Sequence, residues 1–572
     1  MGVATVLLLF SHLQLVFSLT FVNVTETIGL GRTASRRLLT YSDFNADKAT
    51  DILVVTDNGT GLALFVWNGL ENSFEYQELN QIDTKSLVEV QALDFDGDGA
   101  LDILVVSEQS HLYTVCVYWG EVMEGVWSIS GSLVTLDASL QFPPVVLDAN
   151  GDHLPDIFGY TGNRTLRSFG RQWLLVSSDV GLLPSVLAGH YVDLNSDCLS
   201  DLILEGVLNG QQYLEIWLRK LEPFPNTFHL VEHVLLPISN GLGRRKLSFI
   251  DIDGDSVLDI LLFSCDAVCE SHVLYQSKFA DSDILHCRTS ESWSLSFKTV
   301  STEIKDWLIL DDTSPVVGKW SRVFWSDLNL DGFPDIIVMG INQNVEKPLL
   351  LMNVLCQSPS TCLRTLSVTD NQLPAVSNAI ITATFFDLWE DGILDVLMLQ
   401  NGTHRTQLVA YQHKLTNYYS FLKVLVLSGY CFDECSSRTK PYGSVLPGAV
   451  VAFSTTDRNG MKRRSVETPN FVENLVVGAG HKGSASNGWY HQALSLVPNS
   501  QLIVITEPPS SPSRWRIQLY LTPSHLIYST AAVFSVIFVA IAIIIGLLQA
   551  REKYQDTKER KEAKHKFHFS AM

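Results

Sequence analysis

Short aspartate-rich loops recur along the chain, and the spacing of their oxygen-bearing side chains could hold a metal ion. In the clearest copy, Asp94 to Asp102, carboxylates occupy loop positions 1, 3, 5 and 9, and an apolar run follows directly. Alternate residues of a tight turn place their oxygens on one side, and the carbonyl group of position 7 can complete the shell. Six or more hard oxygen ligands in a flexible cage favour Ca²⁺, because Mg²⁺ requires stricter octahedral geometry.

Seven loops follow this pattern, numbered here in chain order, and their first residues lie 51, 54, 45, 58, 76 and 60 positions apart. Such spacing indicates a repeated structural unit. In loop 7, from Asp387 to Asp395, Trp389 replaces the oxygen ligand of position 3, so we expect this loop to be structural only. The predicted calcium ligands of loops 1 to 6 are Asp43, Asn45, Asp47 and Asp51; Asp94, Asp96, Asp98 and Asp102; Asp148, Asn150, Asp152 and Asp156; Asp193, Asn195, Asp197 and Asp201; Asp251, Asp253, Asp255 and Asp259; and Asp327, Asn329, Asp331 and Asp335.

Three alternatives compete with a calcium cage. An EF-hand needs Glu at the twelfth loop position and helices on both sides, but loops 2, 5 and 6 have Val105, Leu262 and Val338 there, within strand-like runs. A glycosyltransferase Asp-x-Asp site would occur once. Metal-free turns capped by Asp and Asn remain the simplest alternative. However, several carboxylates packed together without a cation repel one another and destabilise the folded state. The metal interpretation is strongest for loops 2 and 5, which carry four aspartates each, and weaker for loops 1 and 4, which lack glycine.

Charge and hydropathy indicate an exported, membrane-anchored protein. The net charge is −21 and no basic stripe occurs before the C-terminal tail, so nucleic acid is not an expected partner. Residues 1–18 are apolar and predict a secretory signal peptide. The uncharged run 526–548 is long enough to cross a bilayer, and the basic tail 549–572 predicts a cytoplasmic C-terminus. We therefore expect a type I single-pass protein of the cell membrane.

Glycosylation sequons and paired cysteines fit an ectodomain in an oxidising compartment. The sequons stand at Asn23, Asn58, Asn163 and Asn401, and the last three follow their loops by six or seven residues. A strand of that length would carry these glycans to the face opposite the metals. Local disulfides are expected for the close pairs, because a zinc site would need a second pair of ligands nearby. These pairs are Cys265/Cys269, Cys356/Cys362 and Cys431/Cys435, which leaves Cys116, Cys198 and Cys287 without an assigned partner.

The pattern of strands predicts an all-β ectodomain. Between residues 19 and 420, β-branched runs alternate with turns of Gly, Asn and Pro. Seven units of four strands would close into a seven-bladed propeller, although the long interval between loops 5 and 6 leaves six or eight blades open. Residues 421–522 lack the loops and predict a separate β-rich, membrane-proximal domain that holds the propeller off the bilayer.

The loops resemble the FG-GAP repeats of integrin α-subunit propellers over roughly residues 30–410. The whole chain resembles the T-cell immunomodulatory protein (Linkin) family more closely. That resemblance rests on the seven loops and on the segments 387–395, 498–505, 519–524 and 567–572, and it is weakest between Thr455 and Gly488. It implies a cell-surface glycoprotein without enzymatic activity, acting in cell adhesion and in modulation of T-cell responses. It also implies RuvB-like ATPases and tubulin as cytosolic partners. The integrin motif Gly-Phe-Phe-Lys-Arg is replaced by Gln549-Ala-Arg-Glu-Lys, so the integrin mechanism is not transferred.

Two other functions are weaker expectations. FG-GAP propellers also accompany a phospholipase D active on glycosylphosphatidylinositol, but the chain contains neither His-Glu-x-x-His nor Gly-x-Ser-x-Gly, so we expect no enzyme. A shed ectodomain acting as a soluble factor is the second alternative, and the Pro/Ser-rich segment near Pro508 would be its cleavage region. The extracellular ligand cannot be derived from the sequence.

Overall fold

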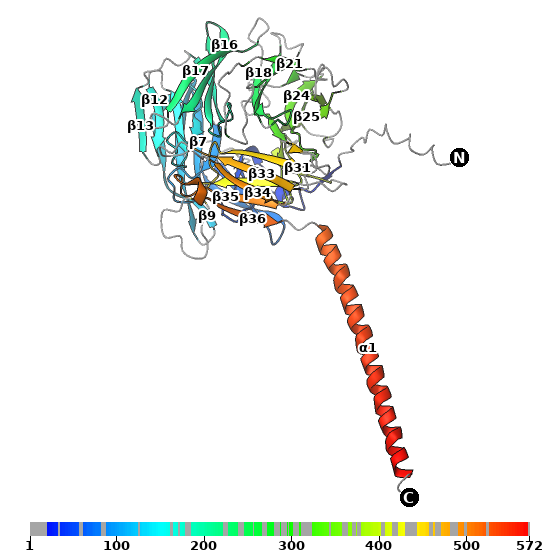
Figure 1. Ribbon diagram of the computed structural model, residues 1–572. Helices are drawn as coiled ribbons and strands as arrows, with labels where there is room; N and C mark the ends of the chain where they lie inside the picture. Colours follow the sequence, from blue (N-terminus) through cyan, green and yellow to red (C-terminus); the bar gives the residue numbers. More distant parts are fainter. Residues whose placement is uncertain are drawn as a thin grey trace, which may run out of the picture. The chain divides into compact units, whose positions relative to one another are not determined.

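The computed structural model of the chain consists mainly of β-strands and ends in one long helix (Figure 1). Its two compact units, Met1–Leu519 and Tyr520–Met572, are described in turn. The structure describes residues 20–569 except 33–34, 57–60, 82–86, 124–125, 161–163, 170–171, 178–184, 221–226, 238–244, 256, 266–271, 279–286, 288–294, 296, 301–307, 310–322, 343–344, 357–363, 369–372, 374–378, 402–405, 415–420, 430–442, 457–461, 464–470, 481–489, 497–499 and 522–524.

The repeating unit is a four-stranded antiparallel sheet whose strands pair in chain order. In the first sheet these are β2 (Ser35–Ser42), β3 (Asp51–Thr56), β4 (Gly61–Asn68) and β5 (Ser73–Gln81). Loop 1 joins β2 to β3, and Ser42 pairs with Asp51 across its ends. All six residues of β3 are buried, as a short Ile/Leu/Val run between two packed layers requires.

Five further sheets follow the same plan, and in each the Asp loop ends at the position-9 aspartate that begins the next strand. They are β6 (Leu87–Leu93), β7 (Asp102–Gln109), β8 (Leu112–Met123) and β9 (Val126–Leu140); β10 (Val145–Leu147), β11 (Asp156–Tyr160), β12 (Arg164–Phe169) and β13 (Gln172–Ser177); β14 (Ser185–Val192), β15 (Asp201–Leu208), β16 (Gln211–Lys220) and β17 (Thr227–Leu235); β18 (Arg245–Ile250), β19 (Asp259–Cys265), β20 (His272–Lys278) and β21 (Lys298–Val300); and β22 (Leu308–Ile309) with β23 (Phe324–Ser326), β24 (Asp335–Asn342), β25 (Val345–Leu355) and β26 (Arg364–Val368).

The N-terminal strand completes the sheet that carries loop 7. This sheet contains β27 (Ala379–Phe386), β28 (Asp395–Asn401) and β29 (Thr406–His413), and β1 (Phe21–Asn23) pairs with the outer edge of β29. The two ends of the repeat region are thereby hydrogen-bonded, with Phe21 opposite His413. This pairing covers an edge that would otherwise expose unpaired backbone groups.

Successive sheets share hydrophobic cores, and the last sheet shares one with the first. Leu53 and Ile103, for example, belong to one core between the first and second sheets. Phe386 and Leu397 of the seventh sheet pack with Ile52 and Phe65 of the first. Equivalent clusters join the second sheet to the third, the third to the fourth, and so on to the seventh. Among the described residues, the cores therefore form an uninterrupted series from sheet to sheet.

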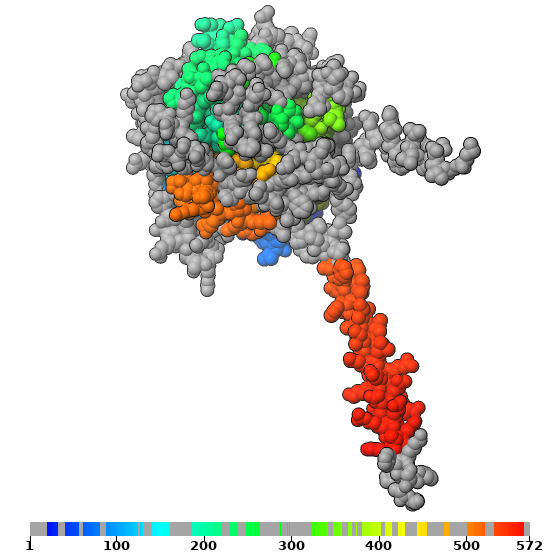
Figure 2. All heavy atoms as spheres, viewed as in Figure 1, coloured from blue at the N-terminus to red at the C-terminus, as the bar shows by residue number. Residues whose placement is uncertain are grey.

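Residues 421–521, here called the C-terminal module, form two smaller sheets. The first contains β30 (Leu422–Leu427), β35 (Ser500–Ile505) and β36 (Arg516–Leu521), with β30 and β35 parallel. The second contains β31 (Val450–Thr456), β32 (Lys462–Arg463), β33 (Phe471–Gly478) and β34 (Tyr490–Leu496). They enclose their own core, which includes Leu475 and Trp515. The last strands of the module, coloured orange, reach the molecular surface (Figure 2).

The C-terminal helix α1 spans His525–Phe569. Its stretch Ala531–Lys564 is long and apolar enough to cross a membrane, which fits a single-pass membrane protein. The predicted span 526–548 therefore lies within one helix that continues through most of the tail. The predicted signal peptide, residues 1–18, lies outside the described residues.

Candidate metal-binding loops

The first aspartate of each loop caps the turn with its carboxylate. In loop 2, Asp94 Oδ1 accepts hydrogen bonds from the backbone N–H of Gly97 at 2.6 Å and of Asp98 at 3.1 Å. Asp94 Oδ2 accepts a third from Gly99 at 2.9 Å. Both glycines have left-handed φ values, 77° and 87°, which explains their place in the strongest version of the pattern. One carboxylate thus accepts hydrogen bonds from three backbone N–H groups of the turn.

The position-9 aspartate ties the loop to two neighbouring strands. Asp102 Oδ2 accepts from Phe95 N at 2.8 Å, and Asp102 Oδ1 accepts from Gly120 N, on β8, also at 2.8 Å. Asp51 makes the same pair of contacts, with Phe44 N and Trp67 N. Because its two oxygens accept hydrogen bonds from backbone N–H groups of the loop and of a neighbouring strand, the position-9 residue fixes the loop to that strand, which we call its latch role. It is also a predicted calcium ligand. The sequence did not reveal the latch role.

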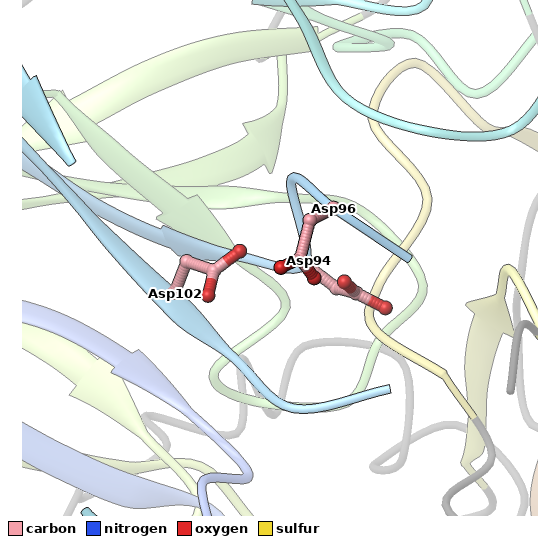
Figure 3. Close-up of side chains that lie close together, drawn as sticks. All are labelled: Asp94, Asp96 and Asp102. Atoms are coloured by element: carbon pink, nitrogen blue, oxygen red, sulfur yellow. The ribbon is translucent and has the colours of Figure 1, made fainter. Parts of the chain in front are cut away.

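Loops 2 and 5 bring three carboxylates each close together. Oxygens of Asp94, Asp96 and Asp102 lie within 4.8 Å of one another, and the groups converge in Figure 3. Asp251, Asp253 and Asp259 form the same arrangement in loop 5. These are the two loops with four aspartates. In loops 1, 3, 4 and 6 the position-3 Asn instead donates its amide N–H to the position-5 carboxylate, at 2.9, 2.9, 3.1 and 3.2 Å.

Burial makes the loop carboxylates unusually difficult to ionise without a cation. It raises the pKa of Asp94 to about 7 and the pKa values of Asp51, Asp102 and Asp156 to about 8. The pKa of Asp193 is also raised well above its usual range by burial.

Two buried carboxylate oxygens in loops 3 and 4 have no hydrogen-bond partner in the protein. Asp156 Oδ1 and Asp193 Oδ1 are buried and accept no hydrogen bond. A buried carboxylate oxygen normally has a partner, and a hard divalent cation would supply one while compensating the clustered charge.

Loop 7 is organised differently. Glu390, with a left-handed φ of 53°, accepts hydrogen bonds from Thr50 N at 3.0 Å and Thr50 Oγ1 at 2.8 Å, next to loop 1. Its other oxygen pairs with the Lys423 ammonium group from the C-terminal module. Burial raises the pKa of Asp387 to about 6, and the positive charge of Lys423 opposes this rise. A lysine thus supplies positive charge at the loop that was expected to be structural only.

Arg219, which no sequence pattern marked, lies between loops 3 and 4. Its side chain is buried, its Nη1 donates to Tyr191 Oη at 2.7 Å, and its backbone N–H donates to Asp201 Oδ1 at 2.9 Å. Its Nε and Nη2 atoms are buried without hydrogen-bond partners. The guanidinium charge lowers the pKa of Asp148 against the larger, raising effect of burial.

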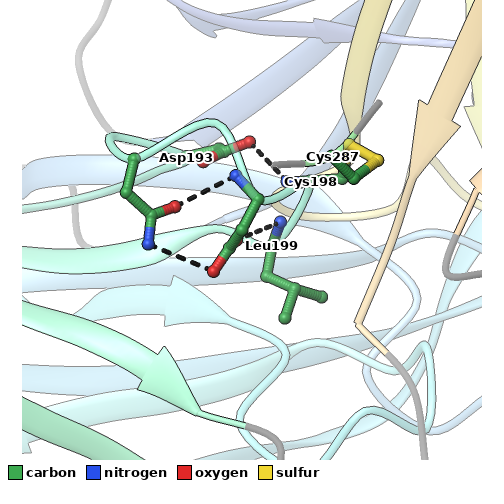
Figure 4. Close-up of a disulfide and its surroundings, with 6 residues drawn as sticks. Asp193, Cys198, Leu199 and Cys287 are labelled. Carbon is green, nitrogen blue, oxygen red and sulfur yellow. Dashed lines mark hydrogen bonds between the residues drawn. A yellow bond between two sulfur atoms is a disulfide. The ribbon is translucent and has the colours of Figure 1, made fainter. Parts of the chain in front are cut away.

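One disulfide joins two cysteines for which the sequence analysis assigned no partner. Cys198 and Cys287, which the local-pair rule left unassigned, are bonded across a separation of 89 residues. Cys198 stands at position 6 of loop 4, where its backbone N–H donates to Asp193 Oδ2 at 2.9 Å (Figure 4). Cys356 is also disulfide-bonded. The other predicted cysteines, Cys362, Cys269, Cys431 and Cys435, and the side chain of Cys265 lie outside the described residues.

Two of the four sequons can be placed. Asn23 and Asn401 are both exposed. Asn401 ends β28, whose first residue is the position-9 Asp395, so it lies at the opposite end of the strand from loop 7, as predicted. Asn58 and Asn163 lie outside the described residues.

Family models match parts of both the repeat region and the C-terminal module. A family model described as FG-GAP-like repeat matches residues 43–105 and 94–159, and one described as ITFG1, C2 domain matches residues 466–520. The human T-cell immunomodulatory protein is 28% identical, with 96% of this chain and 94% of the relative covered. Protein linkin of Caenorhabditis elegans is 27% identical, with 94% and 95% covered.

A shorter relative is more similar in sequence. The T-cell immunomodulatory protein of Macaca fascicularis is 34% identical over 284 residues, which cover 43% of this chain and 88% of that relative. The similarity to the human and nematode proteins extends over nearly the whole chain. The chain therefore belongs to the T-cell immunomodulatory protein family.

Proposed function

We propose that this chain is a type I cell-surface glycoprotein that acts in cell adhesion and recognition and modulates T-cell function. Its ectodomain is a seven-bladed propeller stabilised by calcium. The proposal rests chiefly on one observation: buried carboxylate clusters recur at the same place in successive sheets of a chain that also carries an apolar helix. The names of its relatives favour the role in T-cell modulation. RuvB-like ATPases and tubulin are proposed as partners of the cytoplasmic tail.

Calcium has a structural role in this proposal. Clustered carboxylates repel one another when they are ionised, and a cation that binds only the folded state stabilises it by mass action. The predicted ligands of loops 2 and 5 would hold the ion most directly, since three carboxylates already converge in each. We propose no catalytic activity.

A shed, soluble ectodomain is the less favoured alternative. The predicted cleavage region around Pro508 is folded: its carbonyl oxygen accepts hydrogen bonds from Ser511 N at 3.1 Å and from the indole N–H of Trp515 at 3.2 Å. Trp515 is buried in the core of the C-terminal module. A protease acting there would first have to unfold this turn.

A cell-based measurement tests the proposal. The full chain is displayed on suspension cells, and their adhesion to one another and to T cells is measured with calcium and with chelator. We expect adhesion in calcium and its loss on chelation or in the double variant Asp96→Asn/Asp253→Asn. A C-terminal tag should become accessible to antibody only after permeabilisation. Adhesion absent in calcium, or unchanged by both treatments, would contradict the proposal.

A further inference from the structure

The C-terminal module is seated directly on several Asp loops. Ser444 Oγ accepts a hydrogen bond from Asp94 N of loop 2 at 3.3 Å, and Ser200 Oγ of loop 4 donates to Gly448 O at 2.8 Å. Figure 1 shows the yellow and orange strands of the module, β31 to β36. The module therefore packs against the loop end of the repeat region, rather than standing apart as a spacer.

In loop 3, His153 connects the ligand set to the module. Its backbone, at a left-handed φ of 67°, donates its N–H to Asp148 Oδ2 at 3.1 Å. Its fully buried ring reaches into the module, where Nε2 lies 2.6 Å from Gly480 O and Nδ1 lies 2.9 Å from Thr506 Oγ1. Nε2–H of a neutral ring can donate to the carbonyl, while Thr506 Oγ1 lies within hydrogen-bond distance of both Nδ1 and Leu427 O. One residue thus contacts a predicted calcium ligand and the module simultaneously.

In loop 4, Cys198 occupies the equivalent position. It has a φ of 68° and packs, with its disulfide, against Ala452 and Val476 of the module. The backbone of Gly478 approaches so closely that a Cβ atom there would lie 2.4 Å from the Cys198 carbonyl oxygen. The residue at position 6 therefore contacts the module in both loop 3 and loop 4.

A second glycine places the module against a ligand carboxylate. A Cβ atom on Gly480 would lie 2.7 Å from Arg219 Nη1 and 3.0 Å from Asp148 Oδ2. The module thus covers the buried carboxylates of loops 3 and 4 and shields them from water. Without a metal ion, Arg219 is the cation whose charge acts on Asp148 and Asp197 beneath this cover.

From these contacts we propose that calcium binding by loops 3 and 4 and docking of the C-terminal module are thermodynamically coupled. The inference rests on the proposed calcium binding. A metal ion would fix the turn that holds His153 and Cys198 in their left-handed conformations, and it would offset the repulsion among carboxylates that docking buries. Coupling of this kind is reciprocal, so docking must raise the calcium affinity of the two loops by the same factor.

Hydrogen exchange of the full-length protein in detergent tests whether calcium binding stabilises the docked module. With calcium, the module segments 444–448, 476–480 and 500–506 should exchange at least about tenfold more slowly than with chelator. The double variant Asp152→Asn/Asp197→Asn should lose most of this protection. The matched control Asp253→Asn/Asp255→Asn in loop 5 should keep it, because the position-2 residue of that loop, Ile252, packs in the core shared with the sixth sheet.

Calcium titration tests whether docking of the module raises the calcium affinity of loops 3 and 4. His153→Asn keeps a residue type that tolerates a left-handed backbone but is too short to reach Gly480 O, and Gly480→Ala pushes the module off Arg219 and Asp148. Each variant should weaken calcium binding at loops 3 and 4 by about tenfold. Gly69→Ala is the control and should leave calcium binding unchanged, because the atom nearest to the added Cβ would lie 3.9 Å away.

The outcomes separate the two proposals. If metal analysis finds no bound calcium, the proposed calcium role and the coupling both fail. If calcium binds but the module's exchange and the affinities of these variants stay unchanged, only the coupling fails. Slower exchange in calcium, together with weaker binding in both module variants, supports the coupling.

Discussion

The individual loop aspartates have separable roles, and the position-9 residue is the most constrained. Asp102 holds Phe95 N and Gly120 N on its two oxygens, whereas Asp96 Oδ1 accepts from Asp98 N, a contact that an Asn side chain can also make. Asp102→Asn places an amide N–H₂ against one of those backbone donors and leaves a buried donor unsatisfied.

We therefore expect Asp102→Asn to destabilise the protein by about 1–3 kcal/mol both with calcium and with chelator. Asp96→Asn should lower stability only in calcium. Thermal unfolding of both variants under the two conditions checks this. If Asp102→Asn had no effect in chelator, the latch role of position 9 would be wrong.

Arg219 is the second residue-scale case. Its replacement by Met removes the buried cation that acts on Asp148 and Asp197, and loss of one partner from a buried charge network typically costs about 3–5 kcal/mol. The loss should be larger at pH 7.5 than at pH 5.5, because more of the loop carboxylates are ionised at the higher pH. Arg219→Lys, which keeps the charge, is the control, and denaturant unfolding gives the measurement. Equal losses in the two variants would assign the effect to packing rather than to charge.

At the scale of elements, the disulfide between Cys198 and Cys287 joins loop 4 to the segment that precedes β21. A crosslink that closes a loop of this length restricts the unfolded chain, and its removal typically costs 2–5 kcal/mol. The Cys198→Ser/Cys287→Ser variant should therefore unfold at lower denaturant concentration and should expose the module segment 476–480 to exchange. Cys116→Ser on β8 should leave both properties unchanged. A loss of stability without increased exchange at 476–480 would show that the disulfide supports the loop but not the docked module.

The repeat could be predicted because its chemistry is local. Asp94 to Asp102 contains the turn, the glycines and the start of β7 within nine residues, so spacing alone reveals the unit. The pairing of cysteines 89 residues apart is not local. Nor is the contact of His153 with Gly480, which joins residues 327 positions apart. Arg219 lies within β16, and nothing in the neighbouring sequence distinguishes a buried guanidinium group from an exposed one.

At the scale of the whole molecule, the buried loop carboxylates should make stability depend on pH in a direction that calcium changes. The pKa values of Asp51, Asp102 and Asp156 are raised by burial from 3.8 to about 8. Between about pH 4 and pH 8 the folded, metal-free protein therefore binds more protons than the unfolded chain does. Its free energy of unfolding must fall as the pH rises through this window.

We thus expect the thermal midpoint in chelator to be lower at pH 7.5 than at pH 5.5, the reverse of the usual effect of carboxylates that are stabilised in their ionised form. In calcium the ligands are held ionised, protons compete with the metal, and the midpoint should stay level or rise over the same interval. The gap between the two curves should therefore widen with pH. A constant gap would mean that calcium binds elsewhere, and equal curves would mean that the loops function as hydrogen-bonded turns without a metal.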